Sequence, residues 1–575
     1  MKPYIKMVIG AKITLQNMPS KGHVSLLRLQ SFTVEKRHSL IKLSYGSLLI
    51  LTAIVLVAIN PIQLISDGLL VMKEGSFLYT MWEAPPYQVY SEIHLFNYTN
   101  VEEYISGAAD KLKVQEVGPF RFLEIRTNEN ITVDEGRGVM TMKPKLALKF
   151  LRDQSVGDLE NITIVAPNIA LLALSTLAAD KLPYWSNAGA YYSIKALGVN
   201  LFRNLTANEI LWGYYDPLVS IANTLLPGWI DFSKLGILDR FYAERDDLVE
   251  VELGDASRKY SINSWNGSPG LLEQGFTDLN TSSQCNTIQG TYEGLMITPN
   301  HPTNKDIPVF RKQGCRIFPF SFHSESSAEY GFNVRRYELK DTAFNRSSPY
   351  VCKCKYNCLP DGFVDVSRCY YGFPIALSKA HLLDVDPAIQ SHFEGMKPDP
   401  AKHSSFIHIE PTIGAPLAVR TTLQVNIAVR MSEGNPITKP LQDKVMPLML
   451  LSLSCETPPP SIIKLLRLKF VIGPALLITF IVFLFAAGVA TGIWGFYRIF
   501  KPKYKLLTQE FNRKTIEKKI SMERRKSIER RRKSFERRKS SMLNVVENLG
   551  LVKVKEDLAK EAVSLLGMSD NDDLV

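Results

Sequence analysis

The chain has 575 residues, 45% of them hydrophobic, and a formal net charge of +11. The charge is concentrated at the two ends: residues 1–42 carry eight Lys and Arg against Glu35 alone, or +7, and residues 498–575 carry 21 against 12 acidic residues, or +9, which leaves −5 for the residues between them. The basic balance therefore describes two tails beside a membrane and does not indicate a nucleic-acid-binding protein.

The first long apolar run covers residues 43–66. As a helix it would extend about 36 Å, enough to cross a hydrocarbon core of about 30 Å. A cleaved signal peptide has a shorter apolar region than this run. We therefore predict a cytoplasmic segment over 1–42 followed by an uncleaved transmembrane signal anchor.

Residues 67–469 are expected to form one large ectodomain, because neither an internal repeat nor a low-complexity linker divides them. Apolar residues have helical spacing from Val165 to about Leu226, including the runs 169–179 and 194–202. Short strand-like runs dominate elsewhere, such as 93–96, 248–253 and 417–429. The pattern predicts an α+β fold with an antiparallel β body and a helical insertion.

N-x-S/T triplets place this middle region outside the cytosol. All of them fall between the two apolar runs, and the candidate glycosylated residues are Asn97, Asn130, Asn161, Asn204, Asn266, Asn280 and Asn345. Their position agrees with the positive-inside rule, which assigns both basic ends to the cytosol.

Six of the seven cysteines also lie in the middle region: Cys285, Cys315, Cys352, Cys354, Cys358 and Cys369. Three disulfides are expected in an oxidising lumen, but spacing alone leaves 15 pairings open. A zinc site is the alternative, and the tight spacing from Cys352 to Cys358 together with the sequons argues against it. Cys455 is the odd cysteine, and is free, acylated or paired between chains.

The second apolar run, 470–497, is too long and too uncharged for a helix of a soluble core and predicts another transmembrane helix. Gly488, Gly492 and Gly495 within it would permit close packing of helices. The chain would then be a two-span membrane protein at the plasma membrane, or at a lysosomal or endosomal membrane, with both termini cytosolic.

Residues 498–575 form a basic cytoplasmic tail in this scheme. Residues 523–540 contain Arg-Arg-Lys-Ser three times, ending at Ser527, Ser534 and Ser540, and carry ten Lys and Arg against three Glu. We interpret these serines as candidate sites for a basophilic kinase and the segment as a helix that binds the anionic inner leaflet, with phosphorylation as an electrostatic switch. A solvated charged helix without a regulatory role is the alternative.

Two further signals follow in the tail. Glu561, Leu565 and Leu566 fit an acidic dileucine signal for a clathrin adaptor, although such strings also arise on ordinary amphipathic helices. The terminal residues 573–575 are compatible with binding to a PDZ domain.

The sequence contains no recognisable catalytic motif, such as G-x-S-x-G, H-E-x-x-H or a P-loop, and its nine histidines show no metal-ligand spacing. We therefore predict no enzyme activity, no cofactor and no metal site.

Seven motifs in register carry a resemblance to a known family. They are Trp-Glu-Ala-Pro-Pro at 82–86, Ile-His-Leu-Phe-Asn-Tyr-Thr-Asn at 93–100, Glu-Val-Gly-Pro-Phe at 116–120, Leu-Trp-Gly-Tyr-Tyr-Asp-Pro at 211–217, Trp-Asn-Gly at 265–267, Cys-Asn-Thr-Ile-Gln-Gly at 285–290, and the run from Cys358 to Cys369. Together they resemble the class B scavenger receptors, from the first span through the second. The long basic tail departs from the short tails usual in that family.

The resemblance implies a β-barrel-like ectodomain with an apical helical bundle, and a tunnel through which apolar lipid passes from this crown to the bilayer. It implies disulfides between Cys285 and Cys352, Cys315 and Cys369, and Cys354 and Cys358. It also implies lipids, fatty acids or lipoprotein particles as ligands, with basic residues at the apex. The candidates here are Lys149, Arg152, Lys181, Lys195 and Arg203, for which solvated surface charge is the alternative.

Two other functions remain open at this point. Within the family, the alternative is a lysosomal protein that escorts a luminal enzyme. From another class, a trimeric ligand-gated ion channel shares the two spans, internal termini and disulfide-rich ectodomain, although such channels generally carry more cysteines.

Overall fold

The computed structural model describes residues 21–225, 230–243 and 246–548. They divide into two compact units, which we describe separately. One unit lies within Asn60–Leu477, and the other lies within Met1–Ile59 and Ile478–Val575.

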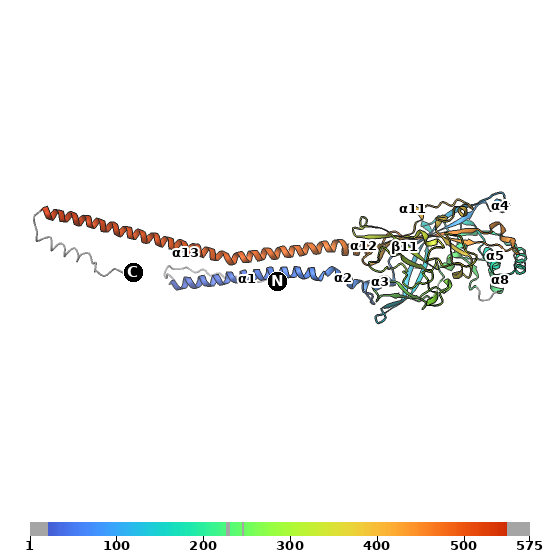
Figure 1. The fold of residues 1–575 in the computed structure, drawn as a ribbon, viewed down its shortest axis with the longest axis horizontal. Helices are drawn as coiled ribbons and strands as arrows, with labels where there is room; N and C mark the ends of the chain where they lie inside the picture. Colours follow the sequence, from blue (N-terminus) through green and yellow to red (C-terminus); the bar gives the residue numbers. More distant parts are fainter. Residues whose placement is uncertain (1–20, 226–229, 244–245, 549–575) are drawn as a thin grey trace, which may run out of the picture. The chain divides into compact units, whose positions relative to one another are not determined.

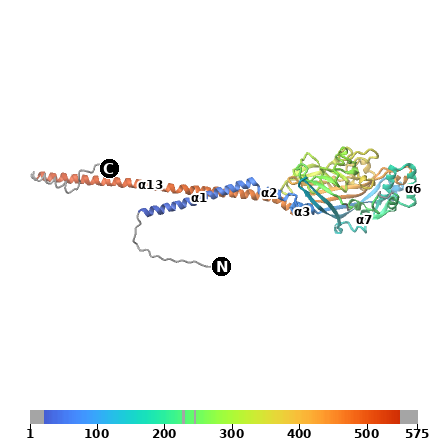
Figure 2. The same ribbon diagram turned by 90° about the horizontal axis from the view of Figure 1, so that it is seen from below.

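The unit within Asn60–Leu477 is built on one large sheet (Figures 1 and 2). Its main path runs β10-β11-β12-β16-β17-β18-β1-β2-β3-β8-β9. The strands are β1 (Val89–Tyr98), β2 (Leu112–Asp134), β3 (Val139–Phe150), β8 (Val249–Glu252), β9 (Ile262–Trp265), β10 (Ile307–Arg311), β11 (Arg316–Ser326), β12 (Val334–Leu339), β16 (Phe406–Glu410), β17 (Ala415–Ala428) and β18 (Val445–Cys455). Off this path lie β13 (Val364–Asp365), β14 (Ile375–Ser378) and β15 (Phe393–Glu394).

All pairings along the main path are antiparallel. β18 lies at the centre, because Leu451 is paired with Ile93 on one side and with Leu423 on the other. Alternate residues of β1 are buried, while β17 and β18 are buried almost throughout. Alternation is typical of a strand with one solvated face, and continuous burial of a strand covered on both faces. The predicted antiparallel α+β architecture is confirmed.

The helical insertion lies at one end of the sheet in Figure 1. It contains α5 (Ile169–Lys181), α6 (Tyr184–Ala196), α7 (Ala207–Trp212), α8 (Pro217–Leu225) and α9 (Ile237–Phe241). Asn168 caps α5 by accepting a hydrogen bond from the Leu171 backbone, and Thr206 forms a capping box with Glu209 at α7.

The expectation of one helix over 194–202 was wrong. α6 ends at Ala196, and Phe202 begins β5 (Phe202–Thr206), which pairs with β4 (Thr163–Pro167). Gly198 has a positive φ that ends the helix easily, and Phe202 contacts Tyr98 in the core. A second short hairpin joins β6 (Tyr214–Tyr215) to β7 (Lys234–Leu235).

The opposite end of this unit holds the segments that adjoin the apolar runs (Figure 1). These are α2 (Pro61–Leu69), α3 (Phe77–Glu83) and α12 (Pro460–Arg467). Ile462 and Leu466 of α12 pack with Phe332, Val334 and Leu417. The remaining short helices are α4 (Val101–Ile105), α10 (Pro387–Gln390) and α11 (Pro400–His403), with single 3₁₀ turns elsewhere.

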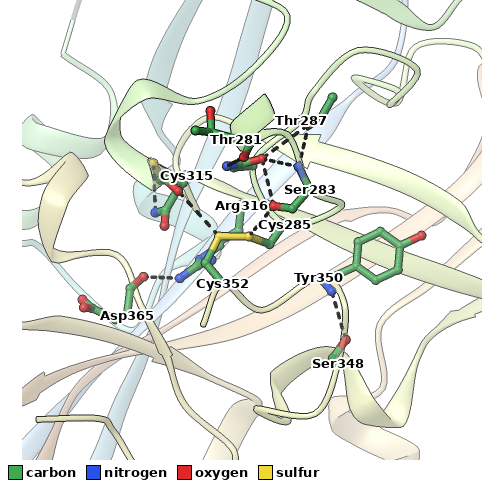
Figure 3. The surroundings of a disulfide bond; sticks show 12 residues. Thr281, Ser283, Cys285, Thr287, Cys315, Arg316, Ser348, Tyr350, Cys352 and Asp365 are labelled. Carbon is green, nitrogen blue, oxygen red and sulfur yellow. Dashed lines mark hydrogen bonds between the residues drawn. A yellow bond between two sulfur atoms is a disulfide. The ribbon is translucent and has the colours of Figure 1, made fainter. Parts of the chain in front are cut away.

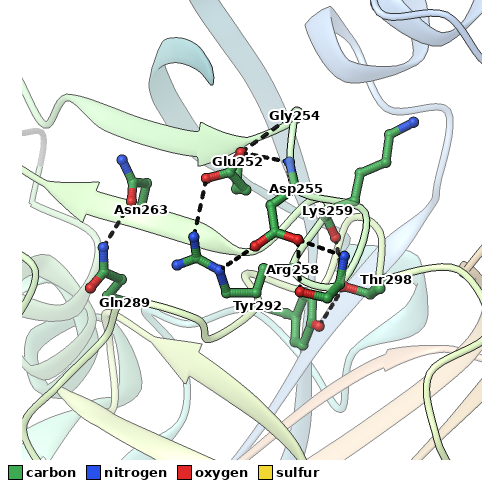
Figure 4. A network of polar contacts seen from close by, with 10 residues as sticks. Glu252, Gly254, Asp255, Arg258, Lys259, Asn263, Gln289, Tyr292 and Thr298 are labelled. Carbon is green, nitrogen blue, oxygen red and sulfur yellow. Dashed lines mark hydrogen bonds and ion pairs between the residues drawn. The ribbon is translucent and has the colours of Figure 1, made fainter. Parts of the chain in front are cut away.

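A polar network fixes the turn after β8 (Figure 4). Glu252 accepts hydrogen bonds from the backbone of Gly254 and Asp255, and the Arg258 guanidinium pairs with Asp255 at 3.0 Å. Hydrogen bonds from Ser257 and the charge of Arg258 lower the pKa of Asp255 to about 2. Since its partners are local, the network holds the turn's shape and does not form a ligand site.

Two helical segments are long and apolar enough to cross a membrane, Lys36–Leu69 and Pro460–Phe500. The first is not one helix, contrary to the expectation for 43–66. α1 (Lys21–Ile59) ends before Asn60, which has a left-handed backbone, and α2 starts at Pro61. Proline disfavours a helical conformation in the residue before it, which explains the break.

The second segment begins before the predicted residue 470. Helix starts at α12, passes through a π-helical turn over Leu468–Ile472, and continues as α13 (Gly473–Asn548). Much of the predicted tail is therefore helical.

Small residues mediate contact between α1 and α13. A Cβ added to Gly46 would lie 2.7 Å from the Gly488 carbonyl oxygen, and one added to Gly495 would lie 3.1 Å from that of Ser39. A Cβ on Gly492, by contrast, would meet nothing within 4 Å. At this antiparallel helix contact within one chain, Gly488 and Gly495 leave no room for a side chain, and Gly492 contributes its backbone nitrogen, 3.0 Å from a Cβ on Gly46. Close contact through small residues is common between helices in membranes.

Candidate ligand-binding site

The structure joins the six cysteines of the unit within Asn60–Leu477 in the pairs that the resemblance implies. These are Cys285 with Cys352, Cys315 with Cys369, and Cys354 with Cys358. Around the first pair (Figure 3), the Ser283 hydroxyl lies 3.2 Å from the Cys285 sulfur, and buried Arg316 donates to the Asp365 carbonyl. Burial lowers the pKa of Arg316 to about 10. The disulfides therefore hold loops beside the sheet.

The predicted glycosylation residues differ in exposure. Asn130, Asn161, Asn204, Asn266 and Asn280 are exposed, whereas Asn97 and Asn345 are half-buried. The Asn97 side-chain oxygen accepts a hydrogen bond from the Val165 backbone, and Asn345 accepts one from Ser347. Addition of a glycan at these two positions would require the surrounding side chains to move.

The five predicted crown cations also differ. Lys149, Lys181 and Lys195 are exposed. Arg152 pairs with Asp158 at 2.6 Å, and Arg203 pairs at 2.6 Å with Asp216, whose side chain is fully buried. Because breaking a buried ion pair is costly, Arg203 holds the helical insertion together and is not available to a ligand.

An aromatic surface that the sequence had not indicated lies on α6. Tyr184, Trp185 and Tyr192 are exposed, Trp185 by 82%, with Lys181 and Lys195 close by in sequence. Exposed apolar groups of this size beside cations are typical of interaction surfaces. By contrast, the apolar run at the start of α5 is buried from Ile169 to Ala173, as core packing would require.

The unit within Asn60–Leu477 contains a cavity of about 640 Å³. It lies between β2 and β3 on one side and Trp212, Phe241 and Tyr242 of the helical insertion on the other. Its volume falls in the range of small-molecule sites, about 300–1,000 Å³.

A second cavity, of about 80 Å³, is lined by Tyr87, Pro416, Ala418 and Cys455 among others. Tyr87 also packs against the cluster that contains α12, so this cavity lies toward the end of the sheet from which the chain enters its second apolar segment. Cys455 is a free, buried thiol, and burial raises its pKa to about 11.

The two cavities share five of their lining residues, which we call the waist: Glu124, Arg126, Glu293, Arg311 and Leu453. Arg126 and Glu293 form an ion pair at 2.8 Å, with 15% and 14% of their side chains exposed. The Tyr242 hydroxyl donates to Glu124 at 3.2 Å. The two cavities therefore adjoin at the waist, where four of the five side chains are charged residues.

A histidine cluster lies elsewhere in the core. His94 Nδ1 is 2.5 Å from one oxygen of Glu116, and His381 Nε2 is 2.9 Å from the other. The ring of His381 stacks on that of His403, with centroids 4.7 Å apart. The hydrogen bonds from His381 and His94 hold the pKa of Glu116 well below its usual range.

Acid should destabilise the unit within Asn60–Leu477 through His403. Burial, assisted by the charge of His381, lowers the pKa of His403 to about 4. The unfolded chain therefore binds a proton between about pH 6.5 and 4 that the folded chain does not, so stability falls as pH falls through that window. With allowance for solvent screening, we expect a loss of about 1 kcal/mol between pH 7 and pH 5.

Chemical unfolding of the wild type and His403→Gln at both pH values measures this effect. Burial also lowers the pKa of His301, His392 and His408, which adds to the loss of stability in acid. It raises the pKa of Glu124 and Glu410, which opposes that loss. These groups are common to both proteins and cancel in the comparison. An equal loss of stability in both proteins would show that His403 is not the cause.

The tail serines Ser527, Ser534 and Ser540 are all exposed on α13. Local ion pairs bring Glu529 to Lys533 and Glu536 to Arg532. The dileucine candidates Glu561, Leu565 and Leu566 lie outside the described residues, as do 573–575.

Comparison with known proteins gives a family. The sequence profile of the CD36 family matches residues 44–499. The chain belongs to the CD36 family. Its relatives include scavenger receptor class B member 1 of Mus musculus, 30% identical over 383 residues that cover 65% of this chain and 72% of the relative. Lysosome membrane protein 2 of Homo sapiens is 29% identical over 459 residues, which cover 78% of this chain and 91% of the relative.

Membership of the CD36 family confirms the predicted resemblance to class B scavenger receptors. This protein is thus a CD36-family protein of the scavenger-receptor and lysosomal-membrane-protein type. CD36-family receptors are not enzymes, and the prediction of a non-enzymatic protein is confirmed on that ground. Within the described part of the chain, no group of three His, Cys, Asp or Glu side chains is placed to hold a metal ion.

Sequence reasoning missed the waist and the α6 aromatics. Glu124 and Arg126 lie two apart on β2, a spacing that places them on one face, but a strand with a solvated face shows the same pattern. Glu293 and Arg311 lie more than 160 residues farther along the chain. Only the fold brings these four residues to one cavity.

Proposed function

We propose that this CD36-family protein binds lipid or lipoprotein particles at its helical end and passes apolar lipid through its ectodomain to the bilayer. The observation that carries the proposal is the pair of adjoining cavities, which extend from Trp212 in the helical insertion to Cys455 near the second apolar segment. An enclosed route would save about 0.8 kcal/mol for each CH₂ group that is kept out of water. Both termini are cytosolic in this proposal, at the plasma membrane or a lysosomal membrane.

The surface of α6 fits the first step. Trp185 and Tyr192 can enter the polar boundary of a particle's lipid surface, where amphipathic aromatic rings are favoured. Lys181 and Lys195 would pair with anionic groups there. This surface, together with Lys149, replaces the five-cation crown of the sequence prediction.

Lipid uptake by cells that express the full chain tests the proposal. Lipoprotein particles would carry one label on a non-hydrolysable cholesteryl ether and another on their protein. We expect the lipid label to accumulate in excess over the protein label. Equal uptake of both labels, or none above cells without the protein, would contradict lipid transfer; recovery of a lysosomal enzyme instead would favour the escort function.

Trp185→Ala should weaken particle binding about thirtyfold, because truncation of an aromatic hot-spot residue of an interface costs about 2 kcal/mol. Binding at 4 °C measures this effect without transfer. Exposed Tyr215 lies outside α6, so Tyr215→Ala is the matched control. Equal binding by the wild type and Trp185→Ala would assign the particle to another surface.

A second function belongs to the tail. We propose that the tail part of α13, residues 508–542, lies on the anionic inner leaflet through the face that carries Ile528, Phe535 and Met542. These residues follow each other at intervals of seven and are all exposed. On an α-helix Arg524, Arg531 and Arg538 project in nearly the same direction, whereas Ser527 and Ser534 lie at its margin. A basic helix with such a stripe binds anionic membranes.

Phosphorylation should release this helix. Three phosphates would add about −4.5 to −6 to the segment 523–540, nearly cancelling its basic excess. Hydrogen exchange over 508–542, measured on the full chain in nanodiscs, should be slower with phosphatidylserine than without it. Treatment with a basophilic kinase should abolish the difference, and a Ser527→Ala, Ser534→Ala, Ser540→Ala variant should keep it. Exchange that does not depend on phosphatidylserine would contradict the proposal.

A further inference from the structure

The two arginines of the waist differ in how many hydrogen-bond acceptors they have. Arg126 has the Glu293 carboxylate at 2.8 Å and the Asn128 side-chain oxygen at 3.2 Å, so its guanidinium is well provided with acceptors. Arg311 ends β10 and lines both cavities. Among the residues that the structure describes, no hydrogen bond or ion pair reaches its guanidinium, which is half-buried.

Glu124 is the other carboxylate of the waist, and its negative charge only partly balances the positive charge of Arg311. Burial raises the pKa of Glu124, although the charges of Arg311 and Arg126 act in the opposite direction. The Glu124 carboxylate also accepts a hydrogen bond from the Tyr242 hydroxyl. A cation that is withdrawn from water without a close anion is unfavourable, so an anionic ligand at this point would gain a strong partner.

The backbone opposite Arg311 leaves room for such a ligand. Gly294 lines the smaller cavity with a positive φ of 98°, and a Cβ at this position would lie 3.7 Å from Arg311 Nη2. A side chain there would be strained, and its Cβ would lie in van der Waals contact with the guanidinium. The glycine therefore keeps one side of the Arg311 fork open to the cavity.

We infer that Arg311 binds the carboxylate of a single-chain lipid acid at the waist, with the acyl chain in the 640 Å³ cavity. This inference rests on the proposed lipid route, and adds to it a site that distinguishes anionic amphiphiles from neutral esters. The planar guanidinium matches a carboxylate with two parallel hydrogen bonds. A neutral ester offers Arg311 no charge and reaches the smaller cavity without being retained.

Two probes of one chain length test the charge selectivity. The full chain in nanodiscs would be titrated with the fluorescent polyene fatty acid cis-parinaric acid and with its methyl ester, each corrected for uptake by empty nanodiscs. We expect the wild type to bind the acid at least about tenfold more tightly than the ester, as a charge-assisted pair would provide. Arg311→Gln should bind both probes with equal affinity, and Arg311→Lys should retain part of the preference.

The outcomes separate this site from the lipid route. If the wild type binds the acid and the ester with equal affinity, the lipid route stands and the Arg311 site is wrong. If neither probe binds, the route fails and the site fails with it. A preference that survives in Arg311→Gln would also overturn the assignment, because the charge would then act from elsewhere. Unchanged ester affinity in Arg311→Gln shows that the variant is folded.

Discussion

Leu453→Trp should reduce lipid transfer at least about tenfold while particle binding stays unchanged. Leu453 is the one apolar member of the waist and lies on β18, in the middle of the sheet. An indole in the smaller cavity of about 80 Å³ would occupy the space where the two cavities adjoin. An added barrier of about 1.4 kcal/mol is enough for a tenfold effect.

The measurement is the ratio of lipid label to protein label in cells, with particle binding at 4 °C measured alongside. Leu453→Met nearly conserves volume and should transfer normally. Ile125→Trp is the matched control, because Ile125 lines only the larger cavity and is about half exposed. Normal transfer by Leu453→Trp, expressed at wild-type level, would mean that lipid does not pass the waist.

Replacing Cys285 and Cys352 with serine should lower the stability of the ectodomain far more than replacing Cys354 and Cys358. The first bond joins residues 67 apart and the second joins residues 4 apart. Loop-closure entropy gives about 4 kcal/mol for the longer loop and about 2 kcal/mol for the shorter one. Both sulfurs of the first bond also lie among packed loops (Figure 3).

Thermal unfolding of the full chain in detergent, followed by near-UV circular dichroism, compares the two double variants with the wild type. We expect the Cys285 and Cys352 variant to unfold at a clearly lower temperature, and the Cys354 and Cys358 variant to lie between it and the wild type. The reverse order would show that chain entropy does not dominate, and that contacts around 354–358 carry the stability.

The architecture was largely predictable from sequence, because apolar length and strand alternation are local signals. The run over 417–429 lies almost entirely within β17, and both apolar segments appear as helix. Boundaries set by single residues were less predictable. Pro61 breaks the first segment, and tertiary contact with Tyr98 draws Phe202 into a strand although its neighbours have helical spacing.

The candidate site was predictable only in part. Basic residues at the crown were indicated, but nothing local distinguishes exposed Lys195 from Arg203, whose partner Asp216 is buried by the fold. Arg311 gave no signal, since a lone arginine near the end of a strand is usually solvated. Its environment depends on strands β2 and β10, which lie far apart along the sheet path.

Photocrosslinking of lipid within the full chain tests the central claim most directly. Membranes that contain the protein would be incubated with particles bearing a diazirine-labelled cholesteryl ester, irradiated and digested for peptide mapping. The lipid route predicts adducts on cavity-lining segments: 144–148 of β3, 241–243 at the end of α9, and the β18 peptide that contains Leu453. Adducts confined to the α6 surface and the membrane-spanning segments would contradict passage through the ectodomain.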